Sequence, residues 1–254
     1  MFARLPEPDR AALRVAPVNL VVYSLNYSAT GPWLPQAGIR WRDALDRHEI
    51  SGKLLGANQQ QLTIMPGVVP EQRIRHGYQV SQENILSATL YEDGLVFETR
   101  QYGGWAQYRS LLERLIRTAA DQREIAVVTS ASLRYVNALS DPGAESAAYW
   151  RGKVQDAFLG PASDEELLDD FKRGIYLLTF NDGVVNAEVR IGVQPDAVLA
   201  NRVAFVFDMD FTDTEQREFN ADEILGRADV LNTAALKVFQ RILAPDYLQK
   251  LANV

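Results

Sequence analysis

The chain has no cysteine among its 254 residues. This absence excludes disulfides, zinc sites with cysteine ligands, iron–sulfur clusters and thiol nucleophiles together. Histidine is scarce as well, because His48 and His76 are the only two. A Ser–His–Asp triad would have to use one of them, and no Gly-x-Ser-x-Gly motif presents a serine. These absences favour a protein that is not an enzyme.

Long hydrophobic runs are also missing. The longest apolar stretches, such as 125–128 and 203–207, have the length of strands and are too short to cross a membrane. The first 14 residues mix arginines with acids and prolines, so they do not resemble a signal peptide. Without cysteines to oxidise, we expect a cytoplasmic protein.

An excess of positive charge is absent too. The net charge is −7, and residues 1–120 hold 13 Lys+Arg against 11 Asp+Glu, whereas residues 121–254 hold 13 against 22. Nucleic-acid-binding proteins usually carry a basic stripe that neutralises phosphates. The acidic balance therefore disfavours direct duplex binding and favours another protein as the partner.

What is present predicts an α+β fold of antiparallel sheets covered by amphipathic helices. Asp-Gly steps between apolar arms predict two β-hairpins, over Leu86–Arg100 and Ile175–Val193. Apolar residues at helical spacing predict one helix after Trp105 and a long one after Asn220. The punctuated segment Gly67–Asn84 is expected to be a long loop.

The two halves of the chain suggest a tandem β-α-β-β-β-α duplication. Each opens with a strand that carries a similar triplet, Leu25-Asn-Tyr27 in one half and Leu133-Arg-Tyr135 in the other. We expect a flexible lead-in over residues 1–16, a first half over 17–123 and a second half over 124–254. The two halves are expected to form one compact unit.

Three stretches together resemble a known family. They are Tyr102-Gly-Gly-Trp105 before a helix, Ser132-Leu-Arg-Tyr-Val-Asn137, and Val206-Phe-Asp-Met-Asp210 before a long helix ending near Phe239. In their order and spacing they resemble a sporadically distributed family of uncharacterised bacterial and archaeal proteins of similar length. The resemblance runs over most of the chain, from the strand after Ala16-Pro17 to the C-terminal helix. It implies one integral fold and no catalytic residue, and its patchy distribution suggests a link to defence.

The strongest chemical candidate is an acidic cluster on one predicted strand. Asp208 and Asp210 alternate with apolar residues, and Asp213 follows on the expected turn. Alternate residues of a strand share a face, so the carboxylates could hold Mg²⁺ or Mn²⁺ for hydrolysis or phosphoryl transfer. The simpler interpretation, which we favour, is the solvated face of a half-buried strand.

A second group of polar residues offers a binding surface. Arg73, Arg75 and His76 fall in the segment expected to be a loop, and Arg134 lies on the opening strand of the second half. Arginine forks suit an anion or an acidic patch of a partner. The other histidine, His48, continues the apolar face of a short predicted helix, where a structural role is the better interpretation.

Three hypotheses for function follow. The first is a non-enzymatic interaction or accessory protein, a component of a bacterial multi-protein or defence-associated assembly. The second is a metal-dependent hydrolase or phosphotransferase that uses Asp208 and Asp210. The third is a carrier that holds a small ligand between the sheet and the C-terminal helix. A homo-oligomer stays open under each of them.

Overall fold

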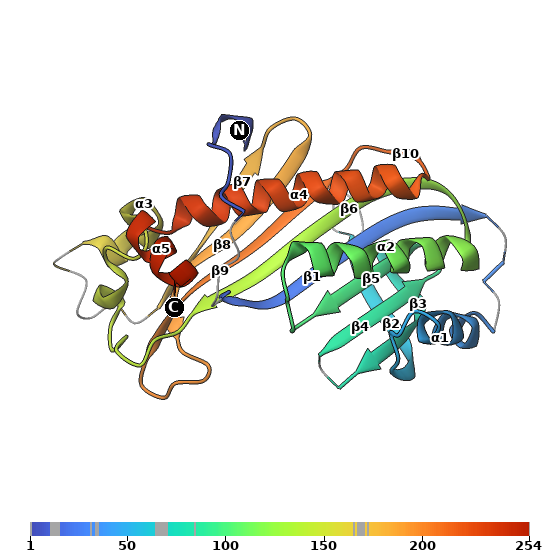
Figure 1. Cartoon of the computed structure of the whole chain (residues 1–254), viewed down its shortest axis with the longest axis horizontal. Coiled ribbons are helices and arrows are strands. Elements are labelled where there is room, and N and C mark those ends of the chain that lie inside the picture. Colours follow the sequence, from blue (N-terminus) through green and yellow to red (C-terminus); the bar gives the residue numbers. More distant parts are fainter. Residues whose placement is uncertain are drawn as a thin grey trace. The chain divides into compact units, whose positions relative to one another are not determined.

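The computed structural model describes residues 2–10, 16–30, 32–33, 36–63, 71–83, 85–164, 166, 171 and 173–253, with only the backbone in 60–63, 71–73 and 253. The described strands form one antiparallel sheet against which five α-helices pack, which confirms the α+β class (Figure 1). Among the described residues no helix is both long and apolar enough to span a membrane.

The strands are ten in the described part of the chain: β1 (Val18–Thr30), β2 (Lys53–Thr63), β3 (Glu71–Gln82), β4 (Leu86–Tyr91), β5 (Gly94–Thr99), β6 (Glu124–Leu139), β7 (Gly174–Asn181), β8 (Val185–Pro195), β9 (Val203–Asp213) and β10 (Arg217–Glu218). The α-helices are α1 (Ala37–Asp46), α2 (Trp105–Gln122), α3 (Asp156–Leu159), α4 (Ala221–Ile242) and α5 (Pro245–Asn253). Short 3₁₀ turns add η1 (Phe2–Arg4), η2 (Ala147–Trp150) and η3 (Gly160–Ser163).

The sheet order is β2-β3-β4-β5-β1-β6-β9-β8-β7, and β10 pairs with β6. The chain divides into two compact units that are not consecutive halves. Unit 1 contains Met1–Val21, Leu133–Asp213 and Ala228–Val254, and unit 2 contains Val22–Ser132 and Thr214–Arg227. Strands β1 and β6 and helix α4 therefore each contribute residues to both units.

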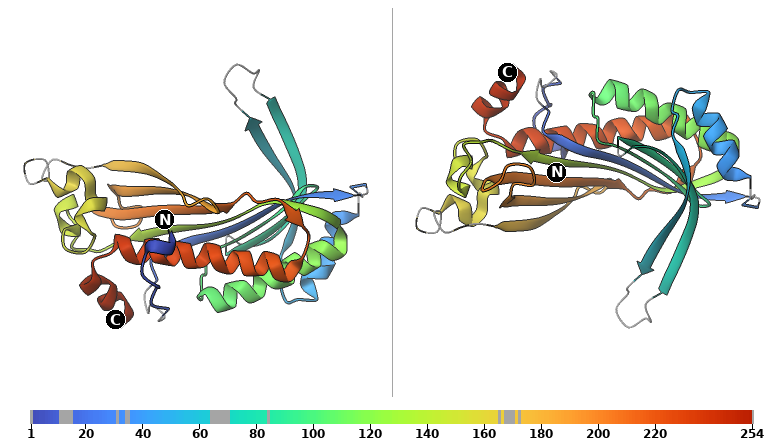
Figure 2. Two further views of the ribbon diagram at one scale, coloured as in Figure 1. Left: turned by 90° about the horizontal axis from the view of Figure 1, so that it is seen from above. Right: turned by 90° about the horizontal axis from the view of Figure 1, so that it is seen from below.

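Unit 2 is organised around a buried tryptophan. Helix α1 turns Trp41, Ala44 and Leu45 inward, as their spacing predicts. The Trp41 indole N–H donates to the backbone oxygen of Ala88 on β4 at 3.1 Å, which satisfies a polar group that is otherwise enclosed. Strand β3 pairs with β2 over its whole length and with β4 only from Gly77 onward. A two-stranded ribbon consequently extends past β4 (Figure 2).

Unit 1 repeats this device with different elements. Trp150 of η2 is fully buried, and its indole N–H donates to the backbone oxygen of Val203 at 3.1 Å. One face of β9 is aromatic, and its Phe207 ring lies 5.5 Å from that of Phe239 on α4. Helix α4 begins where the sequence predicts, since the Asn220 side chain accepts the backbone N–H groups of the first turn.

The N-terminal segment also belongs to unit 1. Phe2 is buried against Phe211, with ring centroids 5.5 Å apart, and Glu7 lies 2.8 Å from the ammonium of Lys237. The side chain of Gln240 accepts the backbone N–H of Asp9. Residues 2–10 of the expected lead-in therefore have specific packing partners.

Both predicted hairpins are confirmed, as β4–β5 and β7–β8. Gly183 has a φ of 91°, the positive value expected for a hairpin glycine. Gly94 is not among the residues with positive φ, because the two residues between β4 and β5 are Glu92 and Asp93. A Cβ on Gly94 would lie 2.2 Å from Nη2 of Arg75, so the glycine provides space there.

Two details of the sequence reading are wrong. Strand β3 occupies most of Gly67–Asn84, which we expected to be a loop, because Glu71–Gln82 pairs with two neighbouring strands despite its polar composition. The first half accordingly has four strands between its helices where the proposed repeat has three. His48 follows the end of α1 and is exposed, so it does not continue the apolar face.

Candidate functional sites

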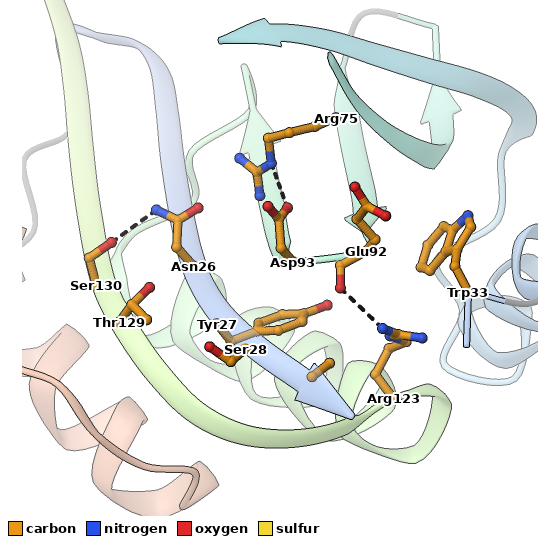
Figure 3. Close-up of a pocket in the computed structure, with 11 residues that line it drawn as sticks. Asn26, Tyr27, Ser28, Trp33, Arg75, Glu92, Asp93, Arg123, Thr129 and Ser130 are labelled. Atoms are coloured by element: carbon orange, nitrogen blue, oxygen red, sulfur yellow. Dashed lines mark hydrogen bonds and ion pairs between the residues drawn. The ribbon is translucent and has the colours of Figure 1, made fainter. Parts of the chain in front are cut away.

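A polar pocket lies within unit 2. It has a volume of about 710 Å³ and brings together segments that are far apart in the sequence (Figure 3). Its lining residues are Asn26, Tyr27, Ser28, Ala29, Trp33, Arg75, Glu92, Asp93, Arg123, Thr129 and Ser130. None of the described residues of α4 is among them, so this is not the pocket against the C-terminal helix that the carrier hypothesis requires.

Arg75 of β3 is the most enclosed cation of this pocket, with 7% of its surface exposed. Its Nε lies 2.6 Å from a carboxylate oxygen of Asp93, and its Nη1 donates to the side chain of Gln59 at 3.2 Å. The guanidinium also lies 4.6 Å from the centre of the Tyr91 ring. Its Nη2 is buried and has no hydrogen-bond partner among the described residues.

Arg123 closes the other side of the pocket, directly after α2, and is 9% exposed. Its Nη1 donates to the backbone oxygen of Pro32 at 3.0 Å and its Nη2 to that of Glu92 at 3.2 Å. Its guanidinium lies 5.3 Å from the centre of the Trp33 ring. Its Nε is buried without a partner in the described part of the chain.

Tyr27 and Asn26 form the floor and one wall of the pocket. The Tyr27 hydroxyl donates towards the backbone oxygens of Tyr91 and Gly94, each at 3.2 Å. Burial raises the pKa of Tyr27 far above its usual value, although Arg123 partly opposes the shift, so the hydroxyl stays protonated. The Asn26 amide donates to Ser130 on the neighbouring strand β6 at 2.9 Å.

In unit 1, Asp208 is the carboxylate of an ion pair. Both of its oxygens accept hydrogen bonds from Arg134, from Nε and Nη2, and each bond is 2.6 Å long. Arg190 lies 3.5 Å from the same carboxylate and 2.9 Å from Glu188. A bidentate arginine occupies the lone pairs that a metal would need. The sequence placed Arg134 and Asp208 in separate candidate sites, and the structure brings them together.

Asp210 lies one position along the same face of β9, opposite Glu188 of β8. Burial raises its pKa, Arg134 lowers it in part, and the nearby Asp208 and Glu188 raise it further. Its Oδ1 is buried without a hydrogen-bond partner among the described residues. A carboxyl group in such surroundings favours the neutral form.

Asp213 does not join these two acids. Strand alternation places it on the opposite face, in register with the buried Phe211 and Phe207, and it is itself buried. The three candidate metal ligands therefore do not converge on one point. Among the residues that the structure describes, no group of three or more His, Asp or Glu side chains could hold a metal ion.

The remaining candidates of the binding surface are dispersed. His76 follows Arg75 on β3, so its side chain leaves the opposite face of the strand, where it is exposed and lies 2.9 Å from Asn58. The side chain of Arg73 lies outside the described residues. Only Arg75 of this group reaches the pocket, and Arg134 belongs to unit 1.

Sequence reasoning missed most of the pocket. Arg123 stood at the end of a predicted helix, and Asp93 at a predicted turn, so each had a local explanation. An available signal was the Glu92-Asp93-Gly94 turn, whose two acids need cationic partners when they are drawn towards a sheet.

The end strand β7 presents a surface of another kind. The sheet order ends at β7, and two of its large apolar side chains are well exposed, Ile175 at 42% and Leu177 at 57%. They share a face with Arg190 of β8, because Leu177 pairs directly with it. The strand contains no charged residue and no proline.

Comparison with known proteins gives little help. A scan against models of protein families finds no match, and neither does a search of curated proteins. Among solved structures, the chain is similar to the di-domain ARO/CYC StfQ from the steffimycin biosynthetic pathway, with 10% identity over 92% of this chain and 99% of that chain. The TM-score of 0.18 is too low to establish a shared fold.

Proposed function

We propose that this chain is a non-enzymatic interaction protein whose sheet is extended at β7 by a strand of a partner protein, within a multi-protein assembly. One observation carries the proposal. The sheet ends in an uncharged strand that leaves Ile175 and Leu177 exposed.

Unprotected end strands are uncommon because their free N–H and C=O groups pair readily with other chains. Proteins usually protect such edges with lysine, proline, bulges or covering loops. Strand β7 carries neither lysine nor proline. Its apolar side chains would supply specificity pockets and its backbone the affinity, which is how strand addition works in peptide recognition.

The other end of the sheet supports this interpretation by contrast. Strand β2 starts at Lys53 and contains Gly56 and the polar run Asn58-Gln-Gln-Gln61, so it has the features that discourage pairing. If both ends were equally polar, β7 would need no explanation. The difference marks β7 as the edge fitted for a partner.

The candidate catalytic groups do not compete with this proposal. Asp208 is bound at both oxygens by Arg134, and both histidines are exposed. The metal-dependent alternative keeps a direct test. It requires a thermal shift with Mg²⁺ or Mn²⁺ that Asp208→Asn removes.

The test of the proposal is affinity purification of the tagged full-length chain from its native host, followed by mass spectrometry. We expect a stoichiometric companion protein with the wild type and its loss with Leu177→Lys, which places a charge on the pairing edge. Val198→Lys is the matched control, because Val198 lies in unit 1 and is 86% exposed. It should retain the companion.

A chain that elutes alone, or a companion that Leu177→Lys does not release, would refute the proposal. Light scattering of the purified chain identifies the remaining outcome. A dimer that Leu177→Lys dissociates would show that β7 pairs with a second copy, and would replace the partner protein named here.

A further inference from the structure

We infer that the pocket of unit 2 binds a carboxylate group, with Arg75 Nη2 and Arg123 Nε as its donors. Both nitrogens are buried, and neither has a partner among the described residues. Buried polar groups in folded proteins are hydrogen-bonded in the great majority of cases. Two such donors on the wall of one cavity indicate an acceptor that comes from outside the chain.

The charges in the pocket specify one anionic group. Arg75 is paired with Asp93 at 2.6 Å. Arg123, in contrast, donates only to two backbone carbonyl oxygens, which carry no formal charge. Figure 3 shows the Glu92 carboxylate directed away from the Arg123 guanidinium. A guanidinium that is 9% exposed therefore stays without a counter-charge until a ligand provides one.

The same charges select a carboxylate over a phosphate. Asp93 and Glu92 both line the pocket, so a dianion would meet two negative groups near the two cations. A carboxylate brings a single charge and two acceptor oxygens in one plane, which matches the arginine fork. One anionic group is enough to complete the unpaired donors.

The shape around Arg75 fits this role. Nη2 of Arg75 occupies the space beside Gly94 where a Cβ would be, only 2.2 Å away, and Asn26 Oδ1 lies 3.3 Å from the same point. The rest of the lining offers the hydroxyls of Ser28, Thr129 and Ser130. The ligand is thus a small polar acid with hydroxyl or amide groups next to its carboxylate, and not an apolar chain.

A carboxylate can come from a free metabolite or from the C-terminus of a protein. Isothermal titration of the full-length chain separates the two sources. One arm uses gluconate against neutral glucose, and the other uses a serine-rich acetylated pentapeptide with a free C-terminal carboxylate against its amidated form. We expect binding in one acid arm and none with the matched neutral probe. Equal heats for an acid and its neutral analogue, or no binding in either arm, would overturn the inference.

Three variants locate the site. Arg75→Gln should weaken binding at least about tenfold, because a charged donor is lost. Arg100→Gln is the control, since Arg100 is exposed, lies in unit 2 and does not line the pocket. Its affinity should equal that of the wild type. Asn26→Arg fills the pocket without removing a cation, and it should abolish binding while the chain stays folded.

Loss of Arg123 threatens the fold, because it holds the carbonyls of Pro32 and Glu92. The Asn26→Arg variant therefore decides cases in which Arg123→Gln fails to fold. Acid binding that survives Asn26→Arg would place the ligand elsewhere. The inference is independent of the β7 proposal, since Leu177→Lys should leave acid binding unchanged.

Discussion

Leu25-Asn26-Tyr27 in unit 2 and Leu133-Arg134-Tyr135 in unit 1 show how one strand pattern serves two purposes. In both triplets the leucine and the tyrosine are buried and the middle residue lies on the other face. In unit 1 that residue is an arginine that binds both oxygens of Asp208. In unit 2 it is an asparagine, and the space beside it stays open as the pocket.

The difference teaches that the middle residue decides whether polar groups close on each other or stay available. The Arg134–Asp208 pair satisfies its own carboxylate. The Arg75–Asp93 pair uses a single 2.6 Å contact and leaves Nη2 unpartnered. A closed pair is structural, and an incomplete one is a binding site. The following predictions test this contrast, from the largest effect to the smallest.

The buried tryptophans should be equivalent in the two units, because each donates its indole N–H to a strand carbonyl. Replacement by alanine should cost about 3–5 kcal/mol of unfolding free energy in either case. Urea denaturation of Trp41→Ala and Trp150→Ala measures this. A cost below about 1 kcal/mol at one of the two positions would contradict the shared construction.

Breaking the closed pair should cost less. Asp208→Asn removes the charge that Arg134 and Arg190 share, and we expect a loss of about 1.5–3 kcal/mol, as for hydrogen bonds to charged groups. Denaturation in urea at neutral pH measures it. The control is Glu188→Gln, whose exposed pair with Arg190 should contribute under about 1 kcal/mol. Equal costs for the two variants would mean that Arg134–Asp208 is not a structural pair.

The tyrosines of the triplets should differ modestly. Tyr135 donates to the side chain of the buried Asn232 at 2.9 Å, and Tyr135→Phe removes this donor. Tyr27 donates to two backbone carbonyls at the longer distance of 3.2 Å. We expect about 1–2 kcal/mol for Tyr135→Phe and about 0.5–1 kcal/mol for Tyr27→Phe by thermal and urea unfolding. The reverse order would show that the pocket depends more strongly on its floor.

The smallest effect concerns the dependence of stability on pH. The pKa of Asp210 is raised above its model-compound value of 3.8, so the folded chain holds this proton more tightly than the unfolded chain. The resulting stabilisation is complete below pH 3.8 and is lost as the pH rises through the folded value. Asp210→Asn should therefore gain stability relative to the wild type between acidic and neutral pH. A constant difference across that window would contradict the raised pKa.

Local features of the fold could be predicted from the sequence, and the candidate site could not. The Asn220 cap and both hairpins depend on residues a few positions apart, and the alternation that places Asp208 beside Asp210 is local as well. Arg134 and Asp208 are 74 positions apart, and only the strand pairing selects them for each other. Strand β3 was missed because its pairing with β2 and β4 overrides a polar composition.

The interleaving of the units has a consequence for synthesis. Met1–Val21 belongs to the same unit as Ala228–Val254, and the Glu7–Lys237 contact spans 230 positions. A chain emerging from the ribosome exposes its N-terminal segment first and its contacts there last, which delays closure until translation is nearly complete. Residues 22–132, in contrast, can begin to fold while the remainder is still being made. The first segment to be synthesised is thus among the last to find its place.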